Sequence, residues 1–517
     1  MSNSDELIQA PSNDLRQRTL AGMAVVGASQ IVKIAVQFLS VIVIARLLTP
    51  EDIGLFAMVL PFASFVGLFQ DLGLTQAIIT AQTLTRGQAT VMFWINFGVS
   101  AILALILAAL APVVAEFYGR PELLGLTLGL ALTLLLSGLA AVQLALLNRS
   151  MRYAALATID MASIIAGFAA AVFFAFLRPS AAALLASSIF TVLVTLVMAW
   201  TLSSWRPGRA ASFGDISQLL RFGAGVTGFN VSNFFARNLD NVLVGRVAGP
   251  QQLGYYDRAY KLLVLPLQQV NRPLGQVLIP ALSRLTEEPD RYRYAYLRVV
   301  QQTLLLITPG VITVMITADT LIPLLMGGQW GPTSAIFSWL ALSGLHQPLT
   351  TTIGWLFISQ GRTTEFARWG LINATVCITA FLIGLPEGAL GVARSYAIAD
   401  TFILAPAVWW IIGRKGPVRT RDLLGLAIPF AVAGAVSGSI VLAASHVLLA
   451  LEMNGWPLLV ASGFCSYLAF LATLALLKPG RATLRETLAL LRSAEGGLRA
   501  FAKRRAEGAK SDASRFR

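Results

Sequence analysis

The chain has 517 residues, of which 56% are hydrophobic and only 12% are charged, and its formal net charge is +14 at pH 7. Soluble domains carry about 25% charged residues, so this composition excludes a soluble protein. Apolar runs of about 20 residues follow one another along the chain without the alternation of a transmembrane β-barrel. The sequence therefore indicates an all-α polytopic membrane protein.

We predict about fourteen transmembrane helices, taken here in chain order. The N-terminal residues 1–15 are polar and slightly acidic and lack the features of a signal peptide, so we expect a disordered cytoplasmic segment. The predicted helices cover residues 20–46, 52–70, 90–115, 122–147, 154–177, 181–203, 217–245, 253–282, 297–325, 334–359, 366–385, 388–412, 423–448 and 456–477.

Lys and Arg are distributed unevenly between the predicted connections. Eighteen lie in connections or segments assigned to the cytoplasm and eleven more in the C-terminal tail, whereas the outer loops hold only Arg46, Arg120, Arg178 and Arg246. Because cytoplasmic loops collect bases, this bias predicts that both termini lie on the cytoplasmic side of a bacterial inner membrane. It also explains the net positive charge without a nucleic-acid partner.

An internal repeat occurs at an offset of 200 residues. Residues 46–54 (RLLTPEDIG) align without a gap with residues 246–254 (RVAGPQQLG), and Gln30, Lys33 and Gln37 fall on Asn230, Asn233 and Arg237. We therefore predict two homologous six-helix lobes around a central cavity, related by a pseudo-two-fold axis along the membrane normal. The predicted parts are the N-lobe 16–203, a cytoplasmic linker 204–216, the C-lobe 217–412 and two extra helices in 413–478.

The tail at residues 479–517 has a different pattern. Apolar residues recur at helical spacing, with bases beside or opposite them, as in Leu484, Arg485 and Leu488. This pattern is typical of an amphipathic helix on the anionic cytoplasmic leaflet, so anionic lipids are the expected partners. Contact with a partner protein and a solvated tail are the alternatives.

Charged residues inside apolar helices are the strongest functional signal, because a charge at the bilayer centre costs roughly 3 kcal/mol. The candidate substrate-binding bases are Lys33, Arg237, Arg258, Lys261, Arg272 and Arg394. The candidate acids for proton or cation coupling are Asp160, Asp240, Asp257 and Asp400. Lys33, Arg272 and Arg394 have no obvious local acid, which favours a role in the cavity. Two pairs, Arg237 with Asp240 and Asp257 with Lys261, are also consistent with purely structural pairing.

No catalytic or cofactor motif is present in the sequence. The two histidines, His346 and His446, are isolated, and Cys377 and Cys465 lie inside apolar runs, so we expect no metal site, no cofactor and no enzymatic activity. The absence of a nucleotide-binding loop favours a secondary transporter. The excess of bases within the predicted spans suits an anionic substrate.

The stretch at residues 236–285 closely resembles the corresponding part of Wzx-type polysaccharide flippases, which act in lipopolysaccharide and exopolysaccharide biosynthesis. IARLLTPEDIGLFAM (44–58) and FQDLGLTQAIIT (69–80) are similar to motifs of that family's first repeat. The family belongs to a superfamily with multidrug exporters and peptidoglycan-precursor flippases. The resemblance implies two six-helix lobes around a V-shaped cavity and the flipping of an undecaprenyl-diphosphate-linked oligosaccharide by alternating access. Polysaccharide polymerase and glycosyltransferases are the implied protein partners.

Three alternatives stay open at this point. A cation- or proton-coupled multidrug exporter of the same superfamily would require a dominant acidic pocket. A membrane-bound oligosaccharide polymerase or ligase would require a large periplasmic loop, which the sequence lacks. A non-transporting scaffold for glycan assembly would recruit its enzymes through the basic tail.

Overall fold

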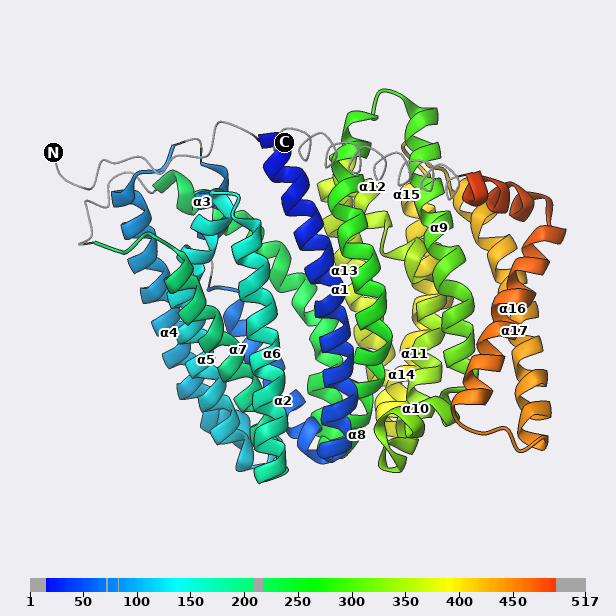
Figure 1. The fold of residues 1–517 in the computed structure, drawn as a ribbon, viewed down its shortest axis with the longest axis horizontal. Coiled ribbons are helices and arrows are strands. Elements are labelled where there is room, and N and C mark those ends of the chain that lie inside the picture. Colours follow the sequence, from blue (N-terminus) through cyan, green and yellow to red (C-terminus); the bar gives the residue numbers. More distant parts are fainter. Residues whose placement is uncertain (1–14, 71–72, 82, 209–216, 490–517) are drawn as a thin grey trace, which may run out of the picture. The chain divides into compact units, whose positions relative to one another are not determined.

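The computed structural model describes residues 15–70, 73–81, 83–208 and 217–489, and every regular element in these ranges is a helix (Figure 1). The side chains of residues 15–29, 31, 80, 217–233, 235–237, 270 and 272 lie outside this description. It therefore does not cover the predicted N-terminus at 1–14, most of the interlobe linker and the tail beyond residue 489.

The chain divides into two compact units. The first comprises Met1–Gln269, Ile322–Leu340 and Thr363–Leu404, and the second comprises Val270–Leu321, Ala341–Arg362 and Ala405–Arg517. These boundaries follow contacts within the structure and do not coincide with the two predicted lobes. The lobe boundaries stay a prediction.

In the first unit, long helices α4 to α7 lie beside one another, α4 packing on α5 and α6 on α7, while α1 packs on α6 (Figure 1). The helices wholly inside this unit are α1 (Leu15–Leu47), α2 (Pro50–Gly67), α3 (Leu74–Thr80), α4 (Arg86–Tyr118), α5 (Glu122–Arg149), α6 (Tyr153–Leu177), α7 (Ala182–Leu202), α13 (Thr363–Gly384) and α14 (Gly388–Ala399). Short helical turns lie at η2 (Gly328–Trp330), η3 (Leu385–Glu387) and η4 (Asp400–Leu404), the last of them a π-helix.

In the second unit, α16 and α17 pack against each other and against α9 (Figure 1). Its helices are α9 (Pro289–Ile316), α12 (Ile353–Ser359), α15 (Ala405–Gly413), α16 (Thr420–Ala450) and α17 (Trp456–Leu476), followed by helical residues 478–489. Three helices contribute to both units: α8 (Ser217–Arg284), α10 (Ala318–Met326) and α11 (Gly331–Thr350).

Nine helical segments of the described residues are long and apolar enough to cross a membrane. They confirm a multi-pass membrane protein but do not establish the predicted fourteen spans. Part of the difference between nine and fourteen has a structural reason. The continuous segment Thr363–Gly413 is counted once but covers two predicted spans. Helix α8, which is not among the nine, covers two more. The predicted turn inside α8 is confirmed, since Gly249 adopts φ 85° and ψ 175°, a left-handed conformation that favours glycine.

The start of α2 shows why the chain turns between the first two helices. The Thr49 hydroxyl accepts from the Asp52 backbone N–H, and the Asp52 carboxylate accepts from the Thr49 N–H, which forms a capping box. Pro50 follows at the first helical position, where its missing N–H costs nothing. The corresponding turn in the second repeat uses Gly249 and Pro250 instead.

The two repeat motifs pack against each other reciprocally. A Cβ atom added to Gly54 would lie 1.7 Å from the Pro250 carbonyl oxygen, and one added to Gly254 would lie 1.9 Å from the Pro50 carbonyl oxygen. These four residues are equivalent in pairs at the 200-residue offset. The backbones of α2 and α8 therefore approach so closely that only glycine fits at either position.

We expect Gly54→Ala and Gly254→Ala each to lower the free energy of unfolding by about 1–3 kcal/mol, because the added methyl group overpacks a backbone contact. Thermal unfolding of the purified protein measures the change. Gly98→Ala is the matched control, since an added Cβ there meets nothing within 4 Å and the substitution should stabilise by about 0.4–1 kcal/mol. Parental stability in both repeat variants would contradict the reciprocal contact.

Candidate functional site

A group of polar side chains in the first unit joins α1 to α6 and α8. Gln269 accepts a hydrogen bond from the Gln30 amide at 2.5 Å and donates one to the Gln37 Oε1 at 3.0 Å. Lys33 lies on α1 between Gln30 and Gln37, about one helical turn from each. Its Nζ lies 3.1 Å from Asp160 Oδ2. We call these five residues the polar patch. It combines a base with amide groups on the polar face that the sequence predicted for the first helix.

Lys33 and Arg394, which have no obvious local acid in the sequence, both have an acidic partner in the structure. Lys33 pairs with Asp160, which comes from α6, and Arg394 pairs with Glu387 at 2.5 Å. Neither acid lies within one helical turn of its base in the sequence, which is why the spacing did not reveal the pairs. Both pairs are partly exposed; in the first, the side chains of Lys33 and Asp160 are 27% and 62% exposed.

Asp257 and Lys261 form an ion pair, as the interpretation of these two residues as a structural pair requires. Lys261 Nζ lies 2.9 Å from Asp257 Oδ1 along one face of α8. Arg258 is buried beside them, with its Nε 4.0 Å from Asp257 Oδ2. Because removing one partner of a buried pair leaves an uncompensated charge, these three residues fit a structural role.

Asp240 is buried and satisfied by hydrogen bonds. The Tyr256 hydroxyl donates to Asp240 Oδ2 at 2.8 Å, and the Asn241 backbone N–H donates to Oδ1 at 2.8 Å. Tyr256 is itself fully buried and stacks on the ring of Tyr260. The predicted partner, Arg237, has a side chain outside the described residues.

The two remaining predicted site residues are Asp400 and Arg272. Asp400 begins the π-helix η4, a geometry that often occurs at functional sites. The side chain of Arg272 lies outside the described residues. No group of three or more potential metal ligands occurs within the described residues.

Sequence analysis missed several residues that organise this unit. Gln269 carries no charge, so a search for embedded charges does not identify it. The partner of Asp240, Tyr256, carries no charge and so gave no signal in a search for embedded charges. Tyr256 lies sixteen residues after Asp240, on the other side of the turn at Gly249, and this position is the sequence feature that could have identified it as the partner.

Arg46 also has a defined role that the sequence did not indicate. Its guanidinium donates to the Leu324 and Leu325 carbonyl oxygens at the end of α10, at 2.6 and 2.7 Å. In return, Trp330 donates its indole N–H to the Ala45 carbonyl oxygen at 2.7 Å. These bonds satisfy carbonyls at two helix ends. Together with the contact of α2 with α8, they close this end of the first unit.

The polar patch can bind an anion and hydroxyl groups. A Lys ammonium donates charge-assisted hydrogen bonds to phosphate, and glutamine amides both donate to and accept from hydroxyls. The pair of Lys33 with Asp160 is partly exposed, so the ammonium of Lys33 is accessible to another anion. Around Asp257, by contrast, the carboxylate and Arg258 are buried, while Lys261 is 38% exposed.

Two relatives among known proteins each cover about three quarters of this chain. Lipopolysaccharide biosynthesis protein WzxC of Escherichia coli (strain K12) is 22% identical over 389 residues, which cover 75% of this chain and 79% of that protein. Succinoglycan biosynthesis transport protein ExoT of Rhizobium meliloti (strain 1021) is 28% identical over 394 residues, covering 76% and 79%.

Two solved structures share the fold. The lipid II flippase MurJ in an inward closed conformation aligns with a TM-score of 0.68 at 14% identity, covering 88% of this chain and 98% of that one. An inward-facing multidrug transporter of the MATE family aligns with a TM-score of 0.59 at 14% identity, covering 77% and 96%. The family model described as polysaccharide biosynthesis protein matches residues 43–335. That match spans more than half of the chain, which therefore belongs to the polysaccharide biosynthesis protein family.

Proposed function

We propose that this protein is a flippase that moves an undecaprenyl-diphosphate-linked oligosaccharide from the cytoplasmic to the periplasmic leaflet of the bacterial inner membrane. The observation that carries the proposal is the polar patch, which places Lys33 and three glutamines among apolar helices. Family membership and the flippase named among the similar folds support it.

The substrate's diphosphate and sugar hydroxyls are the groups that cannot cross hydrocarbon unaided, because each loses its hydration there. In the proposed mechanism, Lys33 exchanges Asp160 for a phosphate oxygen while Gln30, Gln37 and Gln269 replace water around hydroxyl groups. The polyprenyl chain stays in the lipid. Arg237 and Arg272 are proposed to add to the positive potential along the route. Arg258 and Lys261, which lie against Asp257, and Arg394, which pairs with Glu387, are proposed to stay with their acids in a structural role.

We propose alternating access between two six-helix lobes, 16–203 and 217–412, within a fold of fourteen helices. The reciprocal approach of Gly54 to Pro250 and of Gly254 to Pro50 supports the lobe assignment, because equivalent residues meet across a pseudo-two-fold axis. In this scheme the contact closes the periplasmic side while the substrate enters from the cytoplasm. The lobes then rock about it to open the other side.

The remaining assignments follow from the same proposal. Both termini are placed in the cytoplasm, where the lipid-linked substrate is made, and the basic tail is placed on anionic lipid. Translocation makes and breaks no covalent bond, so the protein is proposed not to be an enzyme. Glycosyltransferases supply the substrate and a polysaccharide polymerase consumes it.

We expect Lys33→Gln to weaken binding of the lipid-linked oligosaccharide roughly tenfold to hundredfold, because it removes a charge-assisted hydrogen bond worth about 1.5–3 kcal/mol. The exposed pair contributes little to folding, so the melting temperature should stay near the parental value. Titration of the detergent-solubilised protein with the substrate measures affinity, and a thermal scan measures stability.

Arg120→Gln is the matched control for this substitution. Arg120 also forms an exposed pair, with Glu51 at 3.4 Å, but lies outside the polar patch. Equal affinity in the parent, Arg120→Gln and Lys33→Gln would refute the role of Lys33.

A second expectation concerns Asp240 as a coupling acid. Asp240→Asn keeps an acceptor for Tyr256 and should fold normally while transport loses its response to a proton or sodium gradient. Tyr256→Phe leaves a buried carboxylate short of a partner and should cost about 1–3 kcal/mol of stability. The readouts are gradient-driven flipping in vesicles and thermal unfolding, with the exposed acid variant Asp290→Asn as the control. An unchanged gradient response in Asp240→Asn would remove Asp240 from coupling.

Orientation can be tested by chemical labelling of single cysteines in a background with Cys377 and Cys465 replaced by Ser. Because of the charge bias, we expect a membrane-impermeant maleimide to label Arg120→Cys in intact spheroplasts and Lys415→Cys only after the membrane is opened. Lys415 is exposed in the structure and Arg120 is partly exposed. Labelling in the reverse order would invert the proposed topology.

A further inference from the structure

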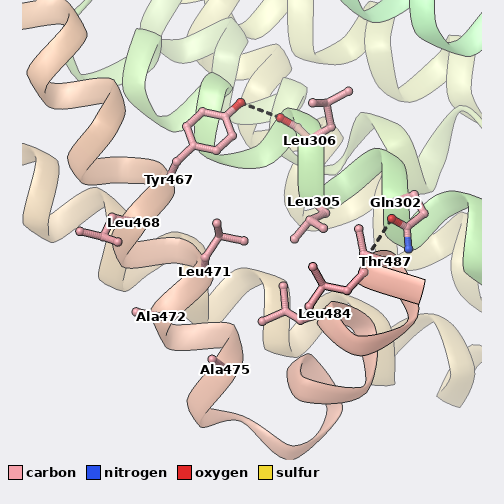
Figure 2. Close-up of a pocket in the computed structure, with 11 residues that line it drawn as sticks. Gln302, Leu305, Leu306, Tyr467, Leu468, Leu471, Ala472, Ala475, Leu484 and Thr487 are labelled. Atoms are coloured by element: carbon pink, nitrogen blue, oxygen red, sulfur yellow. Dashed lines mark hydrogen bonds between the residues drawn. The ribbon is translucent and has the colours of Figure 1, made fainter. Parts of the chain in front are cut away.

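An apolar pocket lies in the second unit, beneath the first turns of the C-terminal tail. Residues of α9, α17 and the helical segment 478–489 line it, and its volume is about 700 Å³ (Figure 2). Leu305 and Leu306 come from α9, Leu471 from α17 and Leu484 from the tail. The volume lies within the range of roughly 300–1,000 Å³ that is usual for ligand pockets.

The polar atoms at the edge of the pocket mostly bond to the protein itself. The Tyr467 hydroxyl donates to the Leu306 carbonyl oxygen at 2.8 Å, and the Thr487 hydroxyl donates to Gln302 Oε1 at 3.0 Å (Figure 2). The pocket therefore offers hydrocarbon rather than hydrogen bonds, which suits an aliphatic chain and not a sugar. Within the described residues, the buried amide nitrogen of Gln302 has no acceptor.

Hydrogen bonds to α9 fix the tail helix over this pocket. Gln301 donates to Thr483, and Thr487 donates to Gln302, so two positions one helical turn apart are attached to adjacent residues of α9. Thr483 is only 1% exposed, which shows how closely the tail packs at this point. The tail helix is thus an ordered wall of the pocket as far as residue 489.

The outer surface of the same helix is basic. Lys478, Arg481 and Arg485 are all exposed, and Arg481 also donates to the Leu476 carbonyl oxygen at the end of α17. Bases beside a membrane surface attract anionic lipid head groups. An apolar pocket under a basic helix therefore matches a molecule with a hydrocarbon chain and a negative head.

We propose that the pocket holds an acyl chain of an anionic glycerophospholipid whose phosphate lies against Lys478, Arg481 and Arg485. This lipid would connect α9, α17 and the tail from the cytoplasmic leaflet. The site requires that these helices lie in a membrane but does not depend on the transport activity.

The test is lipid retention by the purified full-length chain, measured by native mass spectrometry with phosphatidylglycerol and phosphatidylcholine of identical acyl chains. We expect retention of phosphatidylglycerol, and its loss in Ala472→Phe, which fills the pocket without removing a contact. Arg481→Gln with Arg485→Gln should weaken binding roughly twenty-fivefold, about fivefold for each base. Should Ala472→Phe fail to fold, Ala475→Phe, at another lining position, replaces it.

Matched controls separate the site from the general membrane surface. Val460→Phe adds the same ring to an exposed position of α17 outside the pocket, and Lys415→Gln with Arg421→Gln removes two exposed bases elsewhere in the same unit. Both should retain phosphatidylglycerol as the parent does. Equal retention of the two phospholipids, or unchanged retention in both pocket and tail variants, would overturn the proposal. Displacement of phosphatidylglycerol by undecaprenyl phosphate alone would also overturn it, by assigning the pocket to a polyprenyl chain.

Discussion

The constraint that shapes this protein is that a charge placed among apolar helices needs a partner. Transfer of an unpaired charge into hydrocarbon costs several kcal/mol, so the fold supplies acids to its embedded bases. Lys33 has Asp160, Lys261 has Asp257 and Arg394 has Glu387. The acids of these pairs differ in exposure, because Asp257 is buried whereas Asp160 is exposed. We therefore propose that a ligand can displace Asp160 from its base, whereas Asp257 stays with its bases in a structural role.

Close backbone packing supplies a second constraint. At Gly54 and Gly254 the two repeats meet without intervening side chains, and Arg46 and Trp330 bind carbonyl groups nearby in the same unit. Such contacts are short-ranged, so they hold firmly when formed and are lost completely when the backbones separate. Contacts of this kind suit the proposed alternation between two states.

Much of the fold could be predicted from the sequence because its signals are local. Apolar length identified membrane helices, the motif at residues 246–254 indicated the turn that Gly249 makes, and the repeat offset matched positions that pack together. The candidate site was less predictable. Asp160 is 127 residues from Lys33, and no periodicity reveals which distant helices become neighbours. Likewise, the hydrogen bond from Tyr256 to Asp240 depends on the turn geometry rather than on residue spacing.

The account depends most on the claim that the chain alone translocates a lipid-linked oligosaccharide. The direct measurement is to reconstitute the purified protein in proteoliposomes loaded with a fluorescent undecaprenyl-diphosphate oligosaccharide and to follow exposure of its sugar to an added lectin or glycosidase. Our account predicts that sugar on the far leaflet becomes accessible much faster than in protein-free liposomes. Equal rates in the two preparations, with folded protein present, would contradict it.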